Sequence, residues 1–173
     1  MTDIPTSDTE LEAACPGLTV WLYRDIATQR ELPRLPIAVL YETEPGFGHW
    51  VGVLKTPEGI EHFDSYGYKP DTELQFVPVQ YREQFAATAP FLARLLANSG
   101  QQINYNEYKL QGPKSNTCGR WVVARCRNHK LTTSQFAEAM TSLAAKKGIT
   151  LDQSTLLIMP PSAGSGQSQR RSR

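Results

Sequence analysis

Three short segments rich in β-branched and aromatic residues follow one another between residues 36 and 66. Turn residues separate them, which is the pattern of neighbouring strands in a sheet. Before the third segment, Thr56-Pro57-Glu58-Gly59 has proline and glycine at the positions that a type I turn favours. We therefore predict three strands, the last two of which form an antiparallel hairpin, at 36–41, 49–54 and 60–66.

Segments with helical patterns surround a second group of short strands in the rest of the chain. Pro90 is expected to start a second helix within the first helical segment, and the 117–127 segment is apolar around most of its circumference, which predicts a buried helix. The pattern is typical of a single-domain α+β fold, because strands and helices do not alternate strictly. Helices are predicted at 82–98, 117–127 and 131–147, and further strands at 103–110 and 155–159.

The length of 173 residues and the hydrophobic share of 40% fit one domain with its own core. We expect this domain to span residues 1–160 and the Ser/Gly/Arg-rich segment 161–173 to be a disordered tail. No stretch has the roughly 18 uninterrupted apolar residues that a membrane span needs, and the first ten residues are unlike a secretory leader. An intracellular protein without membrane contact is expected.

Charge and cysteine content exclude several classes of protein. The chain has 18 basic and 17 acidic residues, and three of the basic ones, Arg170, Arg171 and Arg173, lie in the tail, so the rest shows no basic bias typical of general nucleic-acid binders. Three cysteines without a C-x-x-C pair argue against a disulfide scaffold and a structural zinc site. We expect free thiols, and we assign Cys15 and Cys126 to packing.

Cys118 has the setting of a reactive thiol. It follows Ser115, Asn116 and Thr117, which are all good N-cap residues, and it precedes the apolar helical segment. A thiol in the first turn of a helix ionises more readily, because the backbone N–H groups and the helix dipole there favour negative charge. Gly119 leaves room for the backbone of a substrate to approach. The alternative is that Cys118 is a small buried hydrophobic residue, as most free cysteines are.

A cysteine nucleophile needs a base, normally histidine, and a group that orients the imidazole. His49 heads one strand of the predicted hairpin, and Asp64 lies on the strand that returns. The two share a face if the hairpin loop has two or four residues, and lie on opposite faces if it has three residues with a bulge at Gly59. The turn residues do not decide between these. His62 is the alternative base, and His129 is interpreted as a surface residue.

Acyl transfer also needs donors aimed at the developing oxyanion, and an amide side chain with the N–H of the nucleophile is a common solution. Gln111 lies seven residues before Cys118, and Gly112-Pro113 allows the chain to fold back over the start of the helix. A surface glutamine is the alternative interpretation. Neither a metal nor a cofactor is expected.

Four motifs in this order resemble the adenain-like cysteine proteases: His49-Trp50, Asp64, Gln111 and Cys118-Gly119. This family includes the adenovirus maturation protease, related proteases of large DNA viruses and virophages, and the ubiquitin-like-protein proteases. The stretch Gln-Gly-Pro-Lys-Ser-Asn-Thr-Cys-Gly, residues 111–119, resembles the viral branch, including the spacing from glutamine to cysteine. The ubiquitin-like-protein branch usually has a shorter interval and Asp-Cys-Gly, which this chain lacks.

The resemblance implies a twisted sheet packed against a buried central helix that starts at the nucleophile Cys118. It implies that His49 is the general base and then acid, that Asp64 orients the imidazole, and that Gln111 and the Cys118 N–H form the oxyanion hole. Trp50 and Gly119 would line a narrow channel for substrate, with cleavage after small residues, often glycine.

The resemblance also implies a biological role, the processing of capsid or core precursor proteins of a DNA virus or virus-like element, in the cytoplasm or nucleus of a host or in the virion. The adenovirus enzyme uses DNA as a cofactor, and the arginines of the tail are a candidate for weak nucleic-acid contact. Two alternatives stay open. One is a deconjugating protease for a ubiquitin-like modifier, and the other is a non-catalytic binding module on the same fold.

Overall fold

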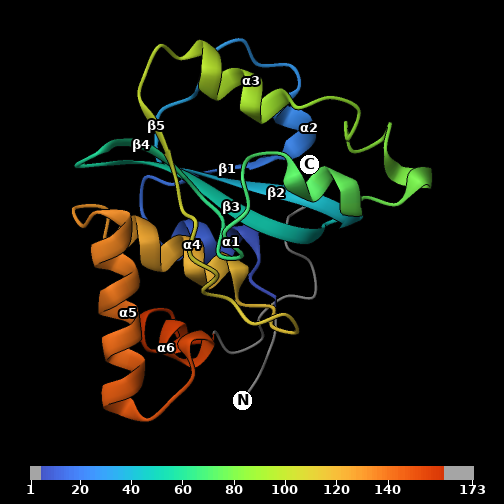
Figure 1. The fold of residues 1–173 in the computed structure, drawn as a ribbon. Helices are drawn as coiled ribbons and strands as arrows, with labels where there is room; N and C mark the ends of the chain where they lie inside the picture. The colour runs from blue at the N-terminus through green and yellow to red at the C-terminus, as the bar shows by residue number, and fades with distance from the viewer. Residues whose placement is uncertain (1–4, 162–173) are drawn as a thin grey trace.

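The computed structural model describes residues 5–161, and these form a single five-stranded mixed sheet with helices on both faces (Figure 1). The strands are ordered β1-β2-β3-β4-β5, the central pairs are antiparallel, and the outer pairs β1-β2 and β4-β5 are parallel. The α+β class is therefore confirmed. The strands are β1 (Thr19–Leu22), β2 (Ile37–Glu44), β3 (Phe47–Thr56), β4 (Gly59–Phe63) and β5 (Ile103–Tyr105).

The helices form two layers, one on each face of the sheet. Figure 1 shows α4 against one face with α1, α5 and α6 on the same side, while α2 and α3 cover the other face. The helices are α1 (Asp8–Ala14), α2 (Tyr23–Ile26), α3 (Phe91–Asn98), α4 (Cys118–Arg127), α5 (Thr133–Lys147) and α6 (Leu151–Ile158), with 3-10 helices η1 (Thr72–Phe76) and η2 (Val79–Tyr81). Within residues 5–161, no helix has the length and apolar character required to cross a bilayer.

The sheet buries both faces, and β3 shows how. Trp50 and Leu54 belong to the core that α4 covers, whereas Val51 and Val53 belong to the core on the side of α3. This alternation follows from the period of two in a strand. The predicted buried helix is α4, in which nine of ten residues are buried. Its apolar circumference is explained by its place between the sheet and the outer helices.

The hairpin of β3 and β4 has a two-residue loop. Thr56 pairs with Gly59, Leu54 with Glu61, and Gly52 with Phe63. Of the two registers left open by the sequence, this is the one that puts the position of Asp64 on the same face as His49. The hairpin thereby brings together two residues that lie 15 positions apart in the chain.

The prediction of a helix over 82–98 is wrong for its first half. Only α3, from Phe91 to Asn98, is helical, and residues 82–89 form turns. Ala86 has a positive φ of 56°, and Phe85 packs in a small separate cluster with Val77 and Ala87. Pro90 is the N-cap of α3, and proline disfavours helical geometry in the residue before it.

Two predicted strands also need correction. Residues 155–159 lie in helix α6 and the turn that ends it, because Thr150 and Gln153 form a capping box that starts a helix four residues earlier. The strand predicted at 103–110 ends at Tyr105. Beyond it, the backbone N–H of Asn106 still donates to the His62 carbonyl, and the side-chain amide of Asn106 donates to the Asp64 and Tyr108 carbonyls, which holds the segment outside a regular strand.

The sequence interpretation missed the N-terminal elements α1, β1 and α2. A capping box of Ser7 and Glu10 starts α1, and this signal was readable in the sequence. By contrast, α5 follows the prediction closely, with Thr132 as N-cap and Gly148 as C-cap. The predicted tail, with Arg170, Arg171 and Arg173, lies outside the described residues except for its first residue.

Candidate active site at the start of helix α4

Cys118 is the first residue of α4 and is buried beside the sheet. Thr117 occupies the N-cap position, as expected, but its hydroxyl does not cap the helix. It donates instead to Asp152 Oδ1 of α6, at 2.7 Å. The backbone N–H groups of the first helical turn have no partner inside the helix, so this end of α4 favours negative charge next to the sulfur.

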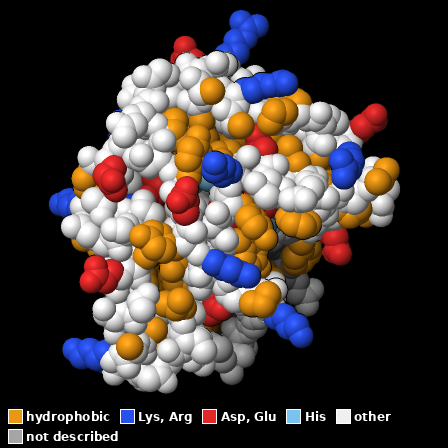
Figure 2. Space-filling model, in the orientation of Figure 1, with side chains coloured by type: hydrophobic (Ala, Val, Ile, Leu, Met, Phe, Trp, Pro, Cys, Tyr) orange, Lys and Arg blue, Asp and Glu red, His pale blue; other side chains and the backbone are white. Residues whose placement is uncertain are grey.

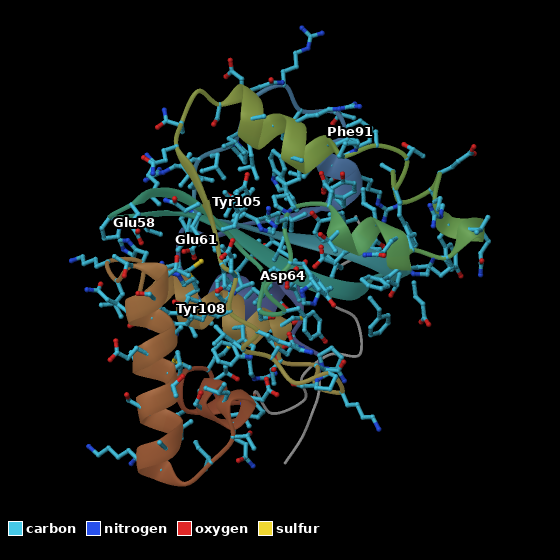
Figure 3. The ribbon with its side chains drawn as sticks, in the orientation of Figure 1. Glu58, Glu61, Asp64, Phe91, Tyr105 and Tyr108 are labelled. Carbon is cyan, nitrogen blue, oxygen red and sulfur yellow. The ribbon has the colours of Figure 1, made fainter. Side chains whose placement is uncertain are left out.

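His49 stands between the thiol and Asp64. Its Nε2 lies 2.9 Å from Asp64 Oδ1, and Cys118 is close enough to help raise the pKa of the imidazole. Asp64 is fully buried just beyond the end of β4 (Figure 3), and its Oδ1 also accepts from the backbone N–H of Tyr66 at 2.8 Å. The structure thus brings Cys118, His49 and Asp64 together in the order that a nucleophile, a base and an orienting group require.

The sulfur has a further contact that the sequence interpretation did not foresee. The backbone N–H of Trp50 points at Cys118 Sγ from 3.5 Å. A hydrogen bond from a backbone donor stabilises a sulfur that carries negative charge. The strand that carries His49 therefore supplies both the imidazole and a donor to the same sulfur.

The surroundings shift the pKa values of His49 and Asp64 so that both side chains are charged. Burial opposes protonation of His49, but hydrogen bonds to Asp64 and Cys118 outweigh it and hold the pKa of His49 well above its ordinary value. Burial likewise opposes ionisation of Asp64, yet hydrogen bonds from His49 and Glu73 hold its pKa below the ordinary value. The site therefore favours an imidazolium beside a carboxylate.

His62, the alternative base, is not in this arrangement. It lies on β4, is fully buried, and burial lowers its pKa to about 4, so it stays neutral near pH 7. Its ring lies 6.4 Å from the ring of Tyr105. His49, and not His62, is the histidine hydrogen-bonded to Asp64. His129 is exposed, as expected.

Gln111 is buried close to the loop that precedes Cys118. Its Oε1 accepts from Ser65 Oγ at 2.6 Å, and its Nε2 donates to the Ser115 carbonyl, also at 2.6 Å. The surface alternative is therefore wrong. Since an amide nitrogen carries two hydrogens, one donor of Gln111 holds the loop and the second is the one that an oxyanion would use. Its role as an oxyanion donor stays a prediction.

Trp50 and Gly119 lie together, but against the chain's own N-terminal segment. Trp50 is fully buried, and its indole N–H donates to the Thr6 carbonyl at 3.1 Å. A Cβ at Gly119 would lie 2.8 Å from Thr6 Cβ and 3.2 Å from Trp50 Cδ1, so only glycine fits there. Whether these residues also contact substrate stays a prediction.

Two acidic residues of the site were missed in the sequence. Asp152 accepts from Thr117, from the indole of Trp121 and from the backbone N–H of Gly112, and so joins both ends of the loop before Cys118 to α6. Glu73 of η1 is buried with Oε1 3.7 Å from His49 Nε2. Neither residue belongs to a motif. The sequence shows only that each is an acidic residue in a polar segment.

His49, Asp64 and Glu73 are also the one group within residues 5–161 that could hold a metal ion, with one ligand atom from each and all three atoms within 4.8 Å of one another. Burial and the neighbouring Asp64 raise the pKa of Glu73 to about 9, so this carboxyl is neutral at pH 7. A neutral carboxyl is a poor metal ligand, and His49 Nε2 is already engaged by Asp64. The group is better described as a proton-sharing cluster.

Aromatic side chains cover the outer side of the imidazole. Tyr66 stacks on His49 with ring centroids 4.7 Å apart, Tyr68 follows at 5.9 Å from Tyr66, and Phe76 at 6.4 Å from Tyr68. Phe76 and Val79 are exposed, and Figure 2 shows hydrophobic side chains reaching the surface on the right of the view, where Figure 1 places the segment around η1 and η2. This row shields the His49–Asp64 hydrogen bond from water.

The remaining two cysteines lie away from the site. Cys15 and Cys126 are free, buried thiols, and each is hydrogen-bonded to the other. The hydrogen bond from Cys126 outweighs burial and lowers the pKa of Cys15 to about 7. The expectation of free thiols is confirmed. Cys15 and Cys126 lie close enough to shift each other's pKa.

Comparison with known proteins gives one clear relative. No protein-family model matches the chain. Over 123 residues it is 32% identical to the uncharacterized protein V9 of Sputnik virophage, and the alignment covers 69% of this chain and 70% of that protein. This supports the viral part of the expectation, and the name of the relative states no activity. The chain belongs to the same family as the uncharacterized protein V9 of Sputnik virophage.

Proposed function

We propose that this protein is a cysteine endopeptidase that cleaves after small, glycine-rich sequences and processes precursor proteins of a virus or virus-like element. The observation that carries the proposal is the convergence of Cys118, His49 and Asp64 at the start of a buried helix. Three elements distant in the sequence supply these groups. A binding module would need none of them in this order.

In the proposed reaction, His49 accepts the proton of Cys118, and the sulfur attacks the carbonyl carbon of the scissile peptide bond. The carbonyl oxygen becomes an oxyanion, and the Cys118 N–H and the second N–H of Gln111 donate to it. The imidazolium then gives its proton to the leaving amine, which departs and leaves a thioester on Cys118. Water, deprotonated by His49, hydrolyses the thioester and restores the thiol.

The surroundings of the sulfur support a preference for small residues. The backbone of Trp50 lies 3.5 Å from Sγ, and the indole of Trp50 and Thr6 leave no space for even one carbon at Gly119. A substrate residue that carries no side chain beyond Cα meets fewer of these contacts. We therefore propose glycine immediately before the scissile bond.

The test is labelling with an electrophilic peptide that ends in glycine, followed by mass mapping of the modified thiol. We expect modification of Cys118, and none of Cys15 or Cys126, which serve as internal controls. His49→Ala should abolish labelling at neutral pH, and its circular dichroism spectrum should remain that of a folded protein. Modification of all three thiols to a similar extent would contradict the proposal.

Substrate class is tested by cleavage of two substrates at equal concentration: a glycine-rich unfolded polypeptide, and a folded ubiquitin-like modifier fused to a reporter. The proposal predicts turnover of the polypeptide. Exclusive turnover of the fusion would favour the deconjugating alternative, and turnover of neither by a protein whose Cys118 reacts with the probe would favour a non-catalytic module.

A further inference from the structure

Glu73 stands out because it buries a carboxyl group beside the His49–Asp64 pair with no cation of its own. It comes from η1, a 3-10 helix that follows the hairpin, and only 4% of its surface is exposed. Its Oε1 lies 3.7 Å from His49 Nε2, and one of its oxygens lies within 4.8 Å of an oxygen of Asp64. Burial of a carboxyl without a partner is costly, so its neighbours must explain it.

The charged and titratable groups around Glu73 come from three elements. His49 from β3 is the one group among them that can carry a positive charge, while Asp64 beyond β4 and Tyr41 of β2 are acids. Tyr41 is itself engaged, because its hydroxyl donates to Asp71. One imidazolium cannot neutralise two carboxylates, so one of the two carboxyls must hold a proton.

The hydrogen bonds indicate which carboxyl holds it. Asp64 Oδ1 accepts from His49 and from the backbone N–H of Tyr66, which favours the charged form of Asp64. Apart from the Asp64–Glu73 contact, neither Asp64 Oδ2 nor the two oxygens of Glu73 has a hydrogen-bond partner within residues 5–161. A proton on Glu73 directed at Asp64 Oδ2 satisfies the donor and the acceptor together.

We propose that Glu73 is a positioning residue whose neutral carboxyl donates a hydrogen bond to Asp64 and so keeps a single negative charge opposite His49. The proposal rests on the function proposed above and deepens it. With one negative charge, the imidazolium is stabilised yet still able to release its proton to the leaving amine. A second negative charge, from ionised Glu73, would hold the proton on His49 and slow this step.

Glutamine is the decisive substitution, because its amide is neutral at every pH and can donate where the protonated carboxyl does. We expect Glu73→Gln to keep kcat within a few-fold of the wild type at pH 7, with KM unchanged. Glu73→Ala removes the donor, and we expect kcat to fall about tenfold to a hundredfold, the value of a hydrogen bond to a charged group, without a change in KM. Glu58→Gln, on the exposed hairpin turn, is the matched control (Figure 3).

The pH profile separates this role from a purely structural one. In the wild type, kcat should decline at alkaline pH as Glu73 loses its proton, and in Glu73→Gln this decline should move to higher pH or disappear. Equal losses of kcat in the Gln and Ala variants, or an alkaline decline that Glu73→Gln leaves in place, would overturn the proposal.

Infrared difference spectroscopy tests the proton without any turnover. In the Cys118→Ala protein at pH 7, the carbonyl band of a neutral carboxylic acid should be present and should vanish in the Cys118→Ala/Glu73→Gln protein. Absence of that band would overturn the proposal even if the protein is a protease, and its presence would support the proton arrangement even if no substrate is cleaved. Tight binding of Zn²⁺ that Glu73→Gln abolishes would also overturn it, because the oxygens would then be ligands.

Discussion

Two buried carboxyl groups lie three residues apart on the same strand and its extension, and they are paired with different cations. Glu61 of β4 faces a guanidinium, whereas Asp64 faces an imidazole (Figure 3 labels both acids). Both side chains are fully buried. Strand and burial are nearly the same for the two acids, so the comparison turns on the groups that surround each of them.

The Glu61 cluster is satisfied by hydrogen bonds, and its cation is permanently charged. Arg125 of α4 donates to both Glu61 oxygens, at 2.7 and 3.3 Å, and Thr133 of α5 donates to one of them as well. The rest of the guanidinium donates to the Asn128 and Leu131 carbonyls. Arginine does not lose its proton in proteins, so the cation of this cluster keeps its charge near neutral pH, while burial raises the pKa of Glu61 above its ordinary value despite the arginine.

The Asp64 cluster has the opposite property. Its cation is His49, whose imidazole gains or loses a proton in the range where cells work, and Glu73 adds an acid without adding a cation. The difference teaches that a buried carboxyl beside arginine holds the fold together, while one beside histidine leaves a proton free to move. Substitutions at the two clusters, at Gln111 and at His62 should separate effects on activity from effects on stability, and their expected effects decrease in this order.

The largest effect on activity is expected from substitutions of Cys118 and of His49, which belongs to the proton-sharing cluster. Cys118→Ala and His49→Ala should each reduce kcat/KM about 10⁴-fold or more, which corresponds to about 5 kcal/mol of transition-state stabilisation. Cys118→Ala should not lower the melting temperature by more than a few degrees, whereas His49→Ala also leaves Asp64 buried without its cation and should lower it further. Activity is measured by cleavage of a peptide with the same sequence as the labelling probe, and stability by thermal unfolding. Full activity in either variant would contradict the assignment of the site.

The Glu61 cluster should respond in stability instead. Arg125→Met leaves Glu61 buried without its cation and should destabilise the protein by about 3–5 kcal/mol, whereas Arg125→Met/Glu61→Met should recover most of this loss. Urea unfolding of the wild type and both variants measures it. A cost below about 1 kcal/mol for the single variant would mean that the ion pair does not anchor α4 to the sheet.

The effect expected at Gln111 is smaller than those at the two clusters. Gln111→Ala should cost about 10²-fold in kcat, if its free amide hydrogen serves the oxyanion, and should leave KM nearly unchanged. Gln101→Ala, on the exposed segment before β5, is the control. A rise in KM at constant kcat would show instead that Gln111 acts on binding, through the loop that it holds at Ser115.

His62, which lies between Glu61 and Asp64, provides the smallest effect. Its pKa of about 4 in the folded state is below that of the unfolded chain, so the unfolded chain binds the proton first as pH falls. From pH 7 to pH 5 this should cost the wild type about 2 kcal/mol of stability more than it costs His62→Gln. Urea unfolding at both pH values measures the difference. His129→Gln, at an exposed histidine, should behave as the wild type does.

Much of the sheet and of helix α4 follows from local patterns. The hairpin between β3 and β4, the buried helix after Thr117 and the capped helix α5 were predictable, because a turn, an apolar circumference and a cap each depend on a few adjacent residues. Where local signals competed, prediction failed. The segment 155–159 has strand-like residues, but the capping box at Thr150 and Gln153 makes it part of a helix.

The candidate site divides in the same way. Cys118, His49, Asp64 and Gln111 were identified from residue type, order and resemblance, and the structure places the first three in one hydrogen-bonded group and Gln111 beside the loop that leads to it. Glu73 and Asp152 were not identified. An acidic residue in a polar loop has no local mark that tells whether it will be solvated or buried.

Residue types and their spacing along the chain were sufficient to indicate a reactive thiol at a helix start with a histidine and an acid on a hairpin. Folding settled the rest: the two-residue turn that puts His49 and Asp64 on one face, and the burial that places Glu73 beside them with no cation but His49 paired to it within residues 5–161. The reason is that pattern is a property of neighbours in sequence, whereas desolvation and charge balance depend on which distant groups share a space without water.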